Sequence, residues 1–372
     1  MRLRTLVLLA VVVVALGGGA AVFALDAGSG PAVTERWVSD TGTEIPSNHH
    51  AVAAGRVDGH GVVYAPISGP DRSDQCGLVA LDATNGTTRW THPIPPANCT
   101  IHSVADPALV DYDADGTTEV LASTTTDRLL ALSPRDGRME YEAPLSDYGY
   151  TEPLAADFDA DGGDEIAVVD VRGAVFVLDD DGSVAWRRAL NSTAFAPPQA
   201  ADFTGDGTPE LAVGVSGDRL VLFDGDGSVV WDRDGLGSSV GWTAVVDDDD
   251  AATELVVATT GGDVGVIDGA TGATEWRTDV GRLAAVHAVG DGDGDGDPEV
   301  YAVALDQRLR AFDAATGELE WKTTISADDN QMTPPPALGD LDGDGGLELV
   351  AAANGGDVVV LDAATGGVLG TA

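Results

Sequence analysis

One glutamate recurs along the chain at a nearly constant interval and limits what the chain can fold into. Each copy ends a loop rich in aspartate and glycine and begins an apolar run: Glu119, Glu165, Glu210, Glu254, Glu299 and Glu348. Successive copies are 46, 45, 44, 45 and 49 residues apart. Each interval holds short apolar segments separated by turn residues. A repeat of this length with four short strands is typical of a β-propeller, in which every repeat forms one blade.

Seven such repeats can be counted from their inner strands. These strands are expected to begin near Ala51, Val104, Pro153, Pro198, Thr243, Val286 and Pro335. We therefore predict an all-β, seven-bladed propeller of four-stranded antiparallel blades over residues 31–372. The first repeat is irregular, because its acidic loop is reduced to RVDGHG at 56–61 and SGPDRSDQC at 68–76 separates its middle strands.

An aromatic residue marks the outer strand of each of the first six repeats. We expect the outer strands to end at Trp90, Tyr141, Trp186, Trp231, Trp276 and Trp321, with each ring packed between neighbouring blades. The seventh outer strand, GVLGTA at 367–372, lacks an aromatic residue. ERWVSD at 35–40 resembles the outer strand TEWRTD at 274–279. We therefore predict that this N-terminal segment, near Trp37, pairs with the last blade and closes the ring.

The acidic loops carry Asp at positions 1, 3 and 5, Gly at position 6 and Glu at position 9. Several carboxylates on a tightly curled loop favour Ca²⁺, which accepts many flexible oxygen ligands, over octahedral Mg²⁺. The predicted ligands are Asp111, Asp113, Asp115, Glu119; Asp157, Asp159, Asp161, Glu165; Asp202, Thr204, Asp206, Glu210; Asp291, Asp293, Asp295, Glu299; and Asp340, Asp342, Asp344, Glu348. Position 12 lies in a strand, so these are not EF-hands. The alternative is that the loops are solvated acidic turns.

The fifth repeat departs from this pattern. Its loop has Val246 at position 1 and Ala251 at position 6, so we expect weak or no calcium binding there. The calcium ions of the other loops are expected to be structural.

The net charge of −43 excludes two classes of partner. No basic stripe exists to neutralise the phosphates of a nucleic acid, and anionic lipid headgroups would repel the chain. Yet 44% of the residues are hydrophobic, so the chain can build a core. A core-forming chain with such an acidic surface suits the strong salt of a halophile, where charges are screened over ~3 Å at 1 M. An ordinary secreted acidic protein is the alternative.

The N-terminus is predicted to be separate from the propeller. Arg2 and Arg4 precede an uncharged run over 5–25, about long enough to span a bilayer. Residues 1–30 are expected to be either an uncleaved single-pass signal anchor in the cell membrane or a cleaved signal peptide of a secreted protein. Both options place the propeller outside the cytoplasm. There a disulfide between Cys76 and Cys99 is favoured over two unrelated thiols.

Two family resemblances are visible in each repeat. FDAATGELEW at 312–321 and LDATNGTTRW at 81–90 resemble the repeats of pyrroloquinoline-quinone (PQQ) dehydrogenases and their non-enzymatic relatives. The acidic loops resemble the calcium-binding FG-GAP or VCBS repeats of integrin α-subunits and similar secreted propellers. Together the resemblances cover roughly residues 35–372. They imply a propeller fold and calcium loops, but neither implies a particular activity.

Polar residues in the connections between blades give a candidate ligand face at the channel mouth. They are His49, His50, His102, Tyr150, Glu152, Gln199, Trp242, His287 and Gln331. The favoured function is a non-catalytic, monomeric module that binds a cell-surface protein or glycan. The alternative is a PQQ-dependent dehydrogenase with Trp242 stacked on the quinone. That enzyme would need a catalytic Asp and basic groups for the quinone carboxylates, yet the only lysine is Lys322. We predict no catalytic residues and no PQQ.

Overall fold

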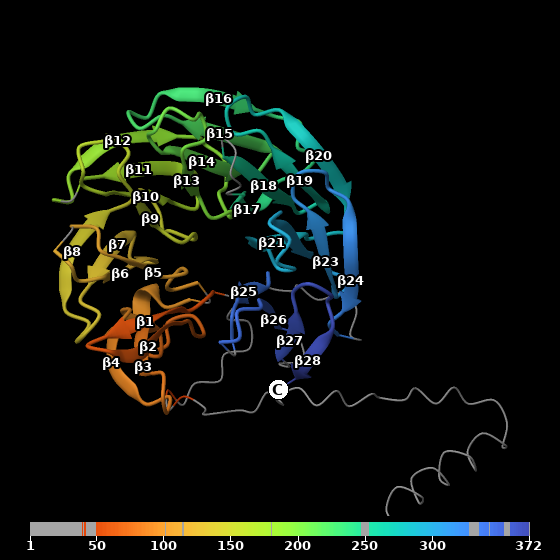
Figure 1. Ribbon diagram of the computed structural model, residues 1–372. Helices are drawn as coiled ribbons and strands as arrows, with labels where there is room; N and C mark the ends of the chain where they lie inside the picture. The colour runs from red at the N-terminus through yellow and green to blue at the C-terminus, as the bar shows by residue number, and fades with distance from the viewer. Residues whose placement is uncertain are drawn as a thin grey trace, which may run out of the picture.

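The protein is a closed ring of seven four-stranded antiparallel sheets (Figure 1). The computed structural model describes residues 39, 41, 50–100, 102–113, 115–179, 181–246, 253–326, 335–341, 343–352 and 358–371. The sheets follow one another in chain order around a central axis, and the first and last sheets lie side by side. The predicted fold class and blade count are confirmed.

The strands of each sheet run outward in chain order from the channel. The innermost strands are β1 (Ala53–Val57), β5 (Ala108–Val110), β9 (Leu154–Ala156), β13 (Gln199–Ala201), β17 (Val240–Val246), β21 (Ala285–Gly290) and β25 (Ala337–Gly339). The second strands are β2 (His60–Ile67), β6 (Glu119–Thr124), β10 (Glu165–Val169), β14 (Glu210–Val215), β18 (Glu254–Thr259), β22 (Glu299–Val303) and β26 (Glu348–Ala352). The third strands are β3 (Gly77–Asp82), β7 (Arg128–Leu132), β11 (Ala174–Leu178), β15 (Arg219–Phe223), β19 (Asp263–Ile267), β23 (Arg308–Asp313) and β27 (Val358–Asp362). The outermost strands are β4 (Thr88–Pro93), β8 (Met139–Pro144), β12 (Val184–Ala189), β16 (Val229–Arg233), β20 (Thr274–Asp279), β24 (Leu319–Thr324) and β28 (Val368–Thr371). A short 3₁₀ helix, η1 (Pro96–Asn98), follows the first blade.

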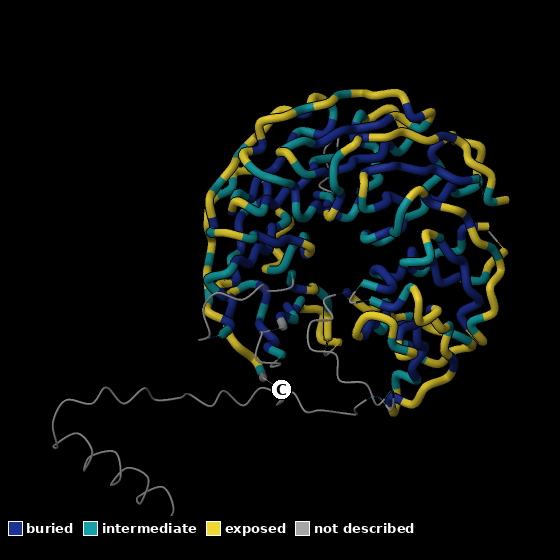
Figure 2. The backbone as a smooth tube through the Cα atoms, turned by 180° about the vertical axis from the view of Figure 1, so that it is seen from behind, coloured by how far each residue is buried: buried dark blue, intermediate teal, exposed yellow. Residues whose placement is uncertain are grey.

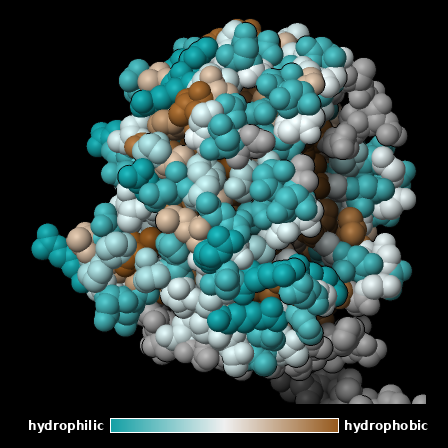
Figure 3. Space-filling model, turned by 90° about the vertical axis from the view of Figure 1, so that its left-hand side faces the viewer, coloured by the Kyte–Doolittle hydropathy of each residue, from teal (hydrophilic) through white to brown (hydrophobic). Residues whose placement is uncertain are grey.

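The core lies between the blades, along their two middle strands (Figure 2). β10 (EIAVV) and β11 (AVFVL) are buried at every position, because the neighbouring sheets cover both of their faces. The outermost strands are mostly exposed and carry charged residues, as in β12 (VAWRRA). Charges on an edge strand oppose pairing with another chain. The side of the ring drawn in Figure 3 is correspondingly mostly hydrophilic.

The prediction that the outer strands end at the aromatic residue is wrong. β4 continues from Trp90 to Pro93, and the other outer strands likewise run past their aromatic residue. A bulge just before the ring explains the difference. In blade one, Ala80 pairs with Trp90 while Leu81 pairs with Thr88, so one residue is left out of the ladder. The extra residue lets the strand bend there and resume pairing afterwards.

The aromatic rings join each blade to the next, as predicted. The Trp231 indole N–H donates a hydrogen bond to the carbonyl of Gly269, which lies in the following blade, at 2.7 Å. The same bond runs from Trp90 to Pro134, Trp186 to Gly225, Trp276 to Ala314 and Trp321 to Ala363. Tyr141 lies at the equivalent place, but its hydroxyl is buried without a partner. These residues are therefore part of the core and not ligand platforms.

Each ring also covers a glycine in the turn of the next blade, and this close contact gives a test. Gly317 has φ +70°, and a Cβ there would lie 2.5 Å from Cδ2 of Trp276. Gly217 has φ +83° with nothing within 4 Å. Gly217→Ala should therefore cost only the strain of holding a non-glycine residue in the left-handed backbone conformation, about 1–2 kcal/mol. Gly317→Ala should cost about 1–3 kcal/mol more, because the ring must move. Chemical denaturation of both variants measures the difference. Equal losses of stability would contradict the close packing of the Trp276 ring on Gly317.

The last blade is completed by the end of the chain, because β28 is its outermost strand. The predicted pairing of residues 35–40 with this blade falls outside the described residues, apart from Ser39. The predicted membrane anchor or signal peptide over residues 1–30 also lies outside them. Within the described residues, no helix has the length and apolar character needed to cross a bilayer.

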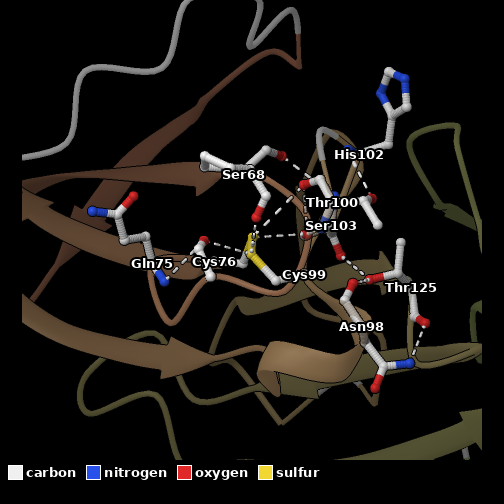
Figure 4. The surroundings of a disulfide bond; sticks show 11 residues. Ser68, Gln75, Cys76, Asn98, Cys99, Thr100, His102, Ser103 and Thr125 are labelled. Carbon is white, nitrogen blue, oxygen red and sulfur yellow. Dashed lines mark hydrogen bonds between the residues drawn. A yellow bond between two sulfur atoms is a disulfide. The ribbon is translucent and has the colours of Figure 1, made fainter.

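The predicted disulfide is present between Cys76 and Cys99, with Cα atoms 5.5 Å apart (Figure 4). It joins the insertion between β2 and β3 to the connection after η1. Both cysteines are buried, and the Ser103 hydroxyl donates to the sulfur of Cys76 at 3.0 Å. The disulfide thus fixes the connection from the first blade to the second.

The two kinds of connection lie on opposite faces of the ring. Adjacent strands are antiparallel, so the loop between a blade's first and second strands lies on the same face as the turn between its third and fourth. The acidic loops and the glycine turns share this face. The blade-to-blade connections, which carry His50 and His102, lie on the other.

Candidate metal centres and the opposite face

Four acidic loops bring ligand oxygens within 4.8 Å of one another. Two loops contribute the Glu at position 9 together with two Asp residues, and one contributes all four predicted carboxylates. The groups are Asp111, Asp113 and Asp115; Asp157, Asp159 and Glu165; Asp202, Asp206 and Glu210; and Asp291, Asp293, Asp295 and Glu299. Glu119 and Asp161 lie outside the groups of their loops. In the last loop Asp342 is outside the described residues.

Backbone hydrogen bonds curl these loops in the same way. The Asp at position 1 accepts a hydrogen bond from the N–H of the Gly at position 6, as Asp291 does from Gly296 at 3.1 Å. This bond recurs at Asp111, Asp157, Asp202 and Asp340, with distances of 2.8–3.2 Å. The last loop therefore shares the backbone geometry of the other four. The first Asp is oriented by the backbone, which leaves the loop carboxylates directed toward a common centre.

The Glu at position 9 closes each loop from the interior of the sheet. Glu119 and Glu210 are 1% exposed and Glu299 is 2% exposed. Glu299 accepts a hydrogen bond from the N–H of Gly292 at 2.7 Å, and Glu165, Glu210 and Glu348 accept the same bond at 2.8 Å. Thr204, predicted as a ligand, donates its hydroxyl to Glu210 at 2.6 Å.

The second blade's loop has unfilled acceptor positions. The Oδ1 atom of Asp111 and the Oε2 atom of Glu119 are buried and have no hydrogen-bond partner. A buried carboxylate oxygen without a partner is costly, and a cation held by the group of Asp111, Asp113 and Asp115 would satisfy the Asp111 oxygen. The donors present, which are carboxylate oxygens, are those that Ca²⁺ prefers.

Among the described residues, no ion pair involves a member of the four carboxylate groups. Arg side chains pair with acidic residues elsewhere, such as Asp232. Burial raises the pKa of Glu119 and of Glu299 to about 7, and that of Glu165 to about 6. Nearby Asp carboxylates contribute part of this rise in the pKa of Glu119 and of Glu165. The charged loop is thus unfavourable until positive charge is supplied.

The loops also contact the following blade. A Cβ on Gly225 would lie 1.8 Å from the carbonyl oxygen of Phe158, so the third blade's acidic loop packs directly on the fourth blade's turn. The Trp186 indole bonds to the same Gly225. In the sixth blade, the Tyr301 hydroxyl donates to Glu299 at 3.0 Å and lies 3.4 Å from the carbonyl of Ala363 in the seventh. The candidate metal loops therefore form part of the blade interface.

Part of the predicted ligand face does assemble. His50 Nδ1 lies 2.9 Å from Oδ1 of Asp106, and His50 Nε2 lies 3.3 Å from Nδ1 of His102. The Tyr150 ring lies against both imidazoles, with centroids 5.2 and 5.1 Å away, and Phe195 lies 5.1 Å beyond Tyr150. Asp106 and Phe195 were not among the residues predicted from the sequence. The only signal for Asp106 was its place just before an inner strand.

The other predicted face residues lie elsewhere or outside the described residues. Trp242 packs against the core cluster shared by the fifth and sixth blades and against the one shared by the sixth and seventh. His287 is an exposed residue of β21, in the sixth blade. Gln199 donates its side-chain amide to the carbonyl of Thr243 at 3.2 Å and so links two blades. His49 and Gln331 are outside the described residues. A cavity of about 320 Å³ opens between the first two blades, lined by residues such as His92 and Met139 and by none of the predicted face residues.

Glu152 lies near this cluster and gives a pH-dependent test. Burial, and secondarily Asp106, raises its pKa from 4.5 to about 7. A raised carboxyl pKa costs stability as pH rises through this interval, with the full cost above pH 7. Glu152→Gln should therefore stabilise the fold at pH 8 by about 1–3 kcal/mol and leave it unchanged near pH 4. Melting at both pH values measures this, with exposed Glu142→Gln as the control. If Glu152→Gln were no more stable than the wild type at pH 8, the conclusion that Glu152 carries a destabilising buried charge would be contradicted.

The ring of four-stranded blades, each joined to the next by a tryptophan and a glycine turn, defines a β-propeller built from PQQ-like repeats. The family model described as outer membrane protein assembly factor BamB matches residues 7–160, 148–334 and 216–372. The chain belongs to this family. The overlapping matches are those expected of a repeat protein. No curated protein matches the sequence.

Solved structures support the fold. BamB from Moraxella catarrhalis is 19% identical, with a TM-score of 0.59 over 87% of this chain and 85% of that one. BBS1N, solved in complex with ARL6DN, is 13% identical, with a TM-score of 0.55 over 72% and 80%. The V. cholerae biofilm matrix protein Bap1 is 14% identical, with a TM-score of 0.53 over 86% and 87%. At these identities the likeness establishes the fold alone.

Proposed function

We propose that this chain is a non-catalytic, calcium-stabilised propeller that acts as a binding or scaffold module outside the cytoplasm. The observation that carries the calcium assignment is the convergence of carboxylate oxygens in four loops without a basic partner among the described residues. The same backbone curl in the last loop favours a fifth site. Calcium supplies the missing positive charge, and Asp oxygens with the buried Glu hold it.

A matched pair of substitutions in the sixth blade tests this assignment. Glu299→Gln removes a buried member of the ligand group, whereas Asp297→Asn removes an exposed charge of the same loop that is outside the group. Calorimetric titration should show one calcium fewer bound, or one site weakened at least tenfold, in Glu299→Gln only. Equal binding by wild type and both variants would contradict the assignment.

Two features support a location outside the cytoplasm. The buried Cys76–Cys99 disulfide is typical of oxidising compartments. The apolar run over 5–25 after two arginines fits a signal anchor or signal peptide. Fractionation of cells that express the full chain tests the location. Recovery of reduced protein from the cytoplasm would contradict it.

A partner protein or glycan at the cell surface is the proposed ligand class. BBS1N shows that a propeller of this fold can bind another protein, because its structure was solved in complex with ARL6DN. Capture from cell-surface extract by the calcium-loaded propeller tests the proposal, with chelated protein as the control. The quinone alternative predicts a different result. Incubation with PQQ and Ca²⁺ should then give dye reduction with alcohols or sugars, and that result would overturn the non-catalytic role.

A further inference from the structure

We propose that Asn85 and Asn191 each carry an N-linked oligosaccharide, and that Asn98, which lies in the same kind of acceptor sequence, carries none. The proposal rests on the proposed location outside the cytoplasm. The acceptor sequence for N-glycosylation is Asn-X-Ser/Thr, in which X is not proline, and it requires a surface loop. Three of the six asparagines begin such a sequence: Asn85-Gly86-Thr87, Asn98-Cys99-Thr100 and Asn191-Ser192-Thr193.

The modification is a group transfer to the side-chain nitrogen of asparagine. The donor class is an oligosaccharide linked through its first sugar to a lipid phosphate, and a membrane-bound transferase joins it to the protein. A bond forms between Nδ2 and C1 of the sugar, and the C1–O bond to the phosphate breaks. The phosphate leaves with the electron pair, and Nδ2 gives one proton to a base of the transferase. The product keeps Oδ1 as an acceptor and one N–H as a donor.

The side chain of Asn85 meets these requirements in the turn between β3 and β4. Asn85 and Thr87 are both exposed. The Oδ1 atom of Asn85 accepts the Thr87 N–H at 2.9 Å and the Thr87 hydroxyl at 2.7 Å. Its Nδ2 atom has no hydrogen bond to any residue that the structure describes. A glycan on Nδ2 therefore leaves both bonds of the turn in place.

Asn191 is equally accessible, in the connection between β12 and β13. Its side chain is exposed, and its φ of 55° lies in the left-handed region that asparagine tolerates. One N–H of Nδ2 donates to the carbonyl of Ala189 at 3.3 Å, which leaves the other for the sugar. The residues that follow are fixed on the fourth blade, because the Ser192 hydroxyl donates to the carbonyl of Ser216 at 2.8 Å. The acceptor nitrogen is thus presented at the surface by a fixed connection.

Asn98 lies in a closed environment, beside the disulfide. It is half-buried in η1, and its Nδ2 atom donates to the carbonyl of Thr125 at 2.9 Å, as Figure 4 shows. The Thr125 hydroxyl donates back to the carbonyl of Asn98. The middle residue of this acceptor sequence, Cys99, is 1% exposed and disulfide-bonded. An oligosaccharide on Asn98 would have to pass between η1 and the turn that follows β6, so the folded protein excludes it.

Mass spectrometry of the full chain, purified from the cells that naturally produce it, tests the proposal. Proteolytic peptides with Asn85 and Asn191 should carry a glycan, whereas the peptide with Asn98 should be unmodified. Asn85→Gln and Asn191→Gln should each lower the intact mass by one glycan. Asn98→Gln is the matched control and should lower it by none.

Two further variants keep the asparagine and remove only the hydroxyl residue of the acceptor sequence. Thr87→Ala and Thr193→Ala should each lose the same glycan as the corresponding asparagine variant, because the transferase requires serine or threonine at this position. Circular dichroism checks that all variants fold.

The outcomes separate this proposal from the proposed location. An unmodified Asn85 or Asn191 in protein recovered from outside the cytoplasm would overturn the glycosylation proposal and leave the location standing. A glycan on Asn98 in the folded protein would overturn the selection among the three acceptor sequences. Recovery of reduced, unmodified protein from the cytoplasm would overturn both the location and the glycosylation.

Discussion

Chelating calcium is expected to lower the melting temperature by more than ten degrees, even in molar KCl. A site whose ligand is present at 100 times its dissociation constant stabilises the fold by about 2.7 kcal/mol. Several such sites are proposed here, and the third blade's loop touches the next blade through the Phe158–Gly225 contact. Strong salt screens exposed charges but screens buried carboxylates such as Glu299 far less. Scanning calorimetry with EGTA and with CaCl₂ at equal ionic strength measures the shift.

The controls for this experiment separate calcium from general screening. Added Ca²⁺ should restore the melting temperature, whereas Mg²⁺ should restore little, because it demands octahedral geometry and gives up water reluctantly. Asp297→Asn should show the same chelator response as wild type. An identical melting temperature with and without chelator would mean that the loops are only solvated turns.

Deleting residues 31–42 is expected to collapse the thermal stability, so that the cooperative unfolding transition of the wild type is no longer seen at the wild-type melting temperature. The first and last blades lie side by side in Figure 1, and the outer strand of the last blade has no aromatic residue to place on the first. The first blade nevertheless has the receiving turn, in which Gly86 is buried with φ +72°. We predict that Trp37 supplies the missing ring.

Single substitutions sharpen this test. Trp37→Ala should destabilise the fold by about 3–5 kcal/mol, the usual cost of removing a large packed aromatic side chain. Trp321→Ala, at an interface inside the ring, is the matched control and should cost a similar amount. If the deletion and Trp37→Ala both melt as wild type does while Trp321→Ala does not, the segment plays no part in closing the ring.

The repeat interval was sufficient to predict the architecture, because one four-stranded blade per interval leaves little choice of fold. The aromatic residue of each outer strand was correctly placed in the core. The bulge before that residue was not foreseen, since it depends on pairing register, as at Trp90. The sequence also did not reveal that the acidic loops lie against the next blade. That contact joins Phe158 to Gly225 and depends on how two sheets pack.

The candidate sites differ in how far sequence could predict them. The predicted metal ligands, such as Asp291 and Glu299, lie within one loop, so their spacing alone indicated convergence. The histidine pair comes from two connections 52 residues apart. Its assembly depends on which blades are neighbours around the ring, which also explains why His287 lies elsewhere. Asp106 could not be assigned at all, because its role comes from contact with His50.

Anomalous-difference crystallography of calcium-grown crystals tests the calcium assignment most directly. We expect a peak in each of the loops that begin at Asp111, Asp157, Asp202, Asp291 and Asp340, with carboxylate oxygens about 2.3–2.6 Å from the ion. The fifth blade's loop should show a weak peak or none. Loops without any peak, and with their carboxylates turned out into solvent, would contradict it.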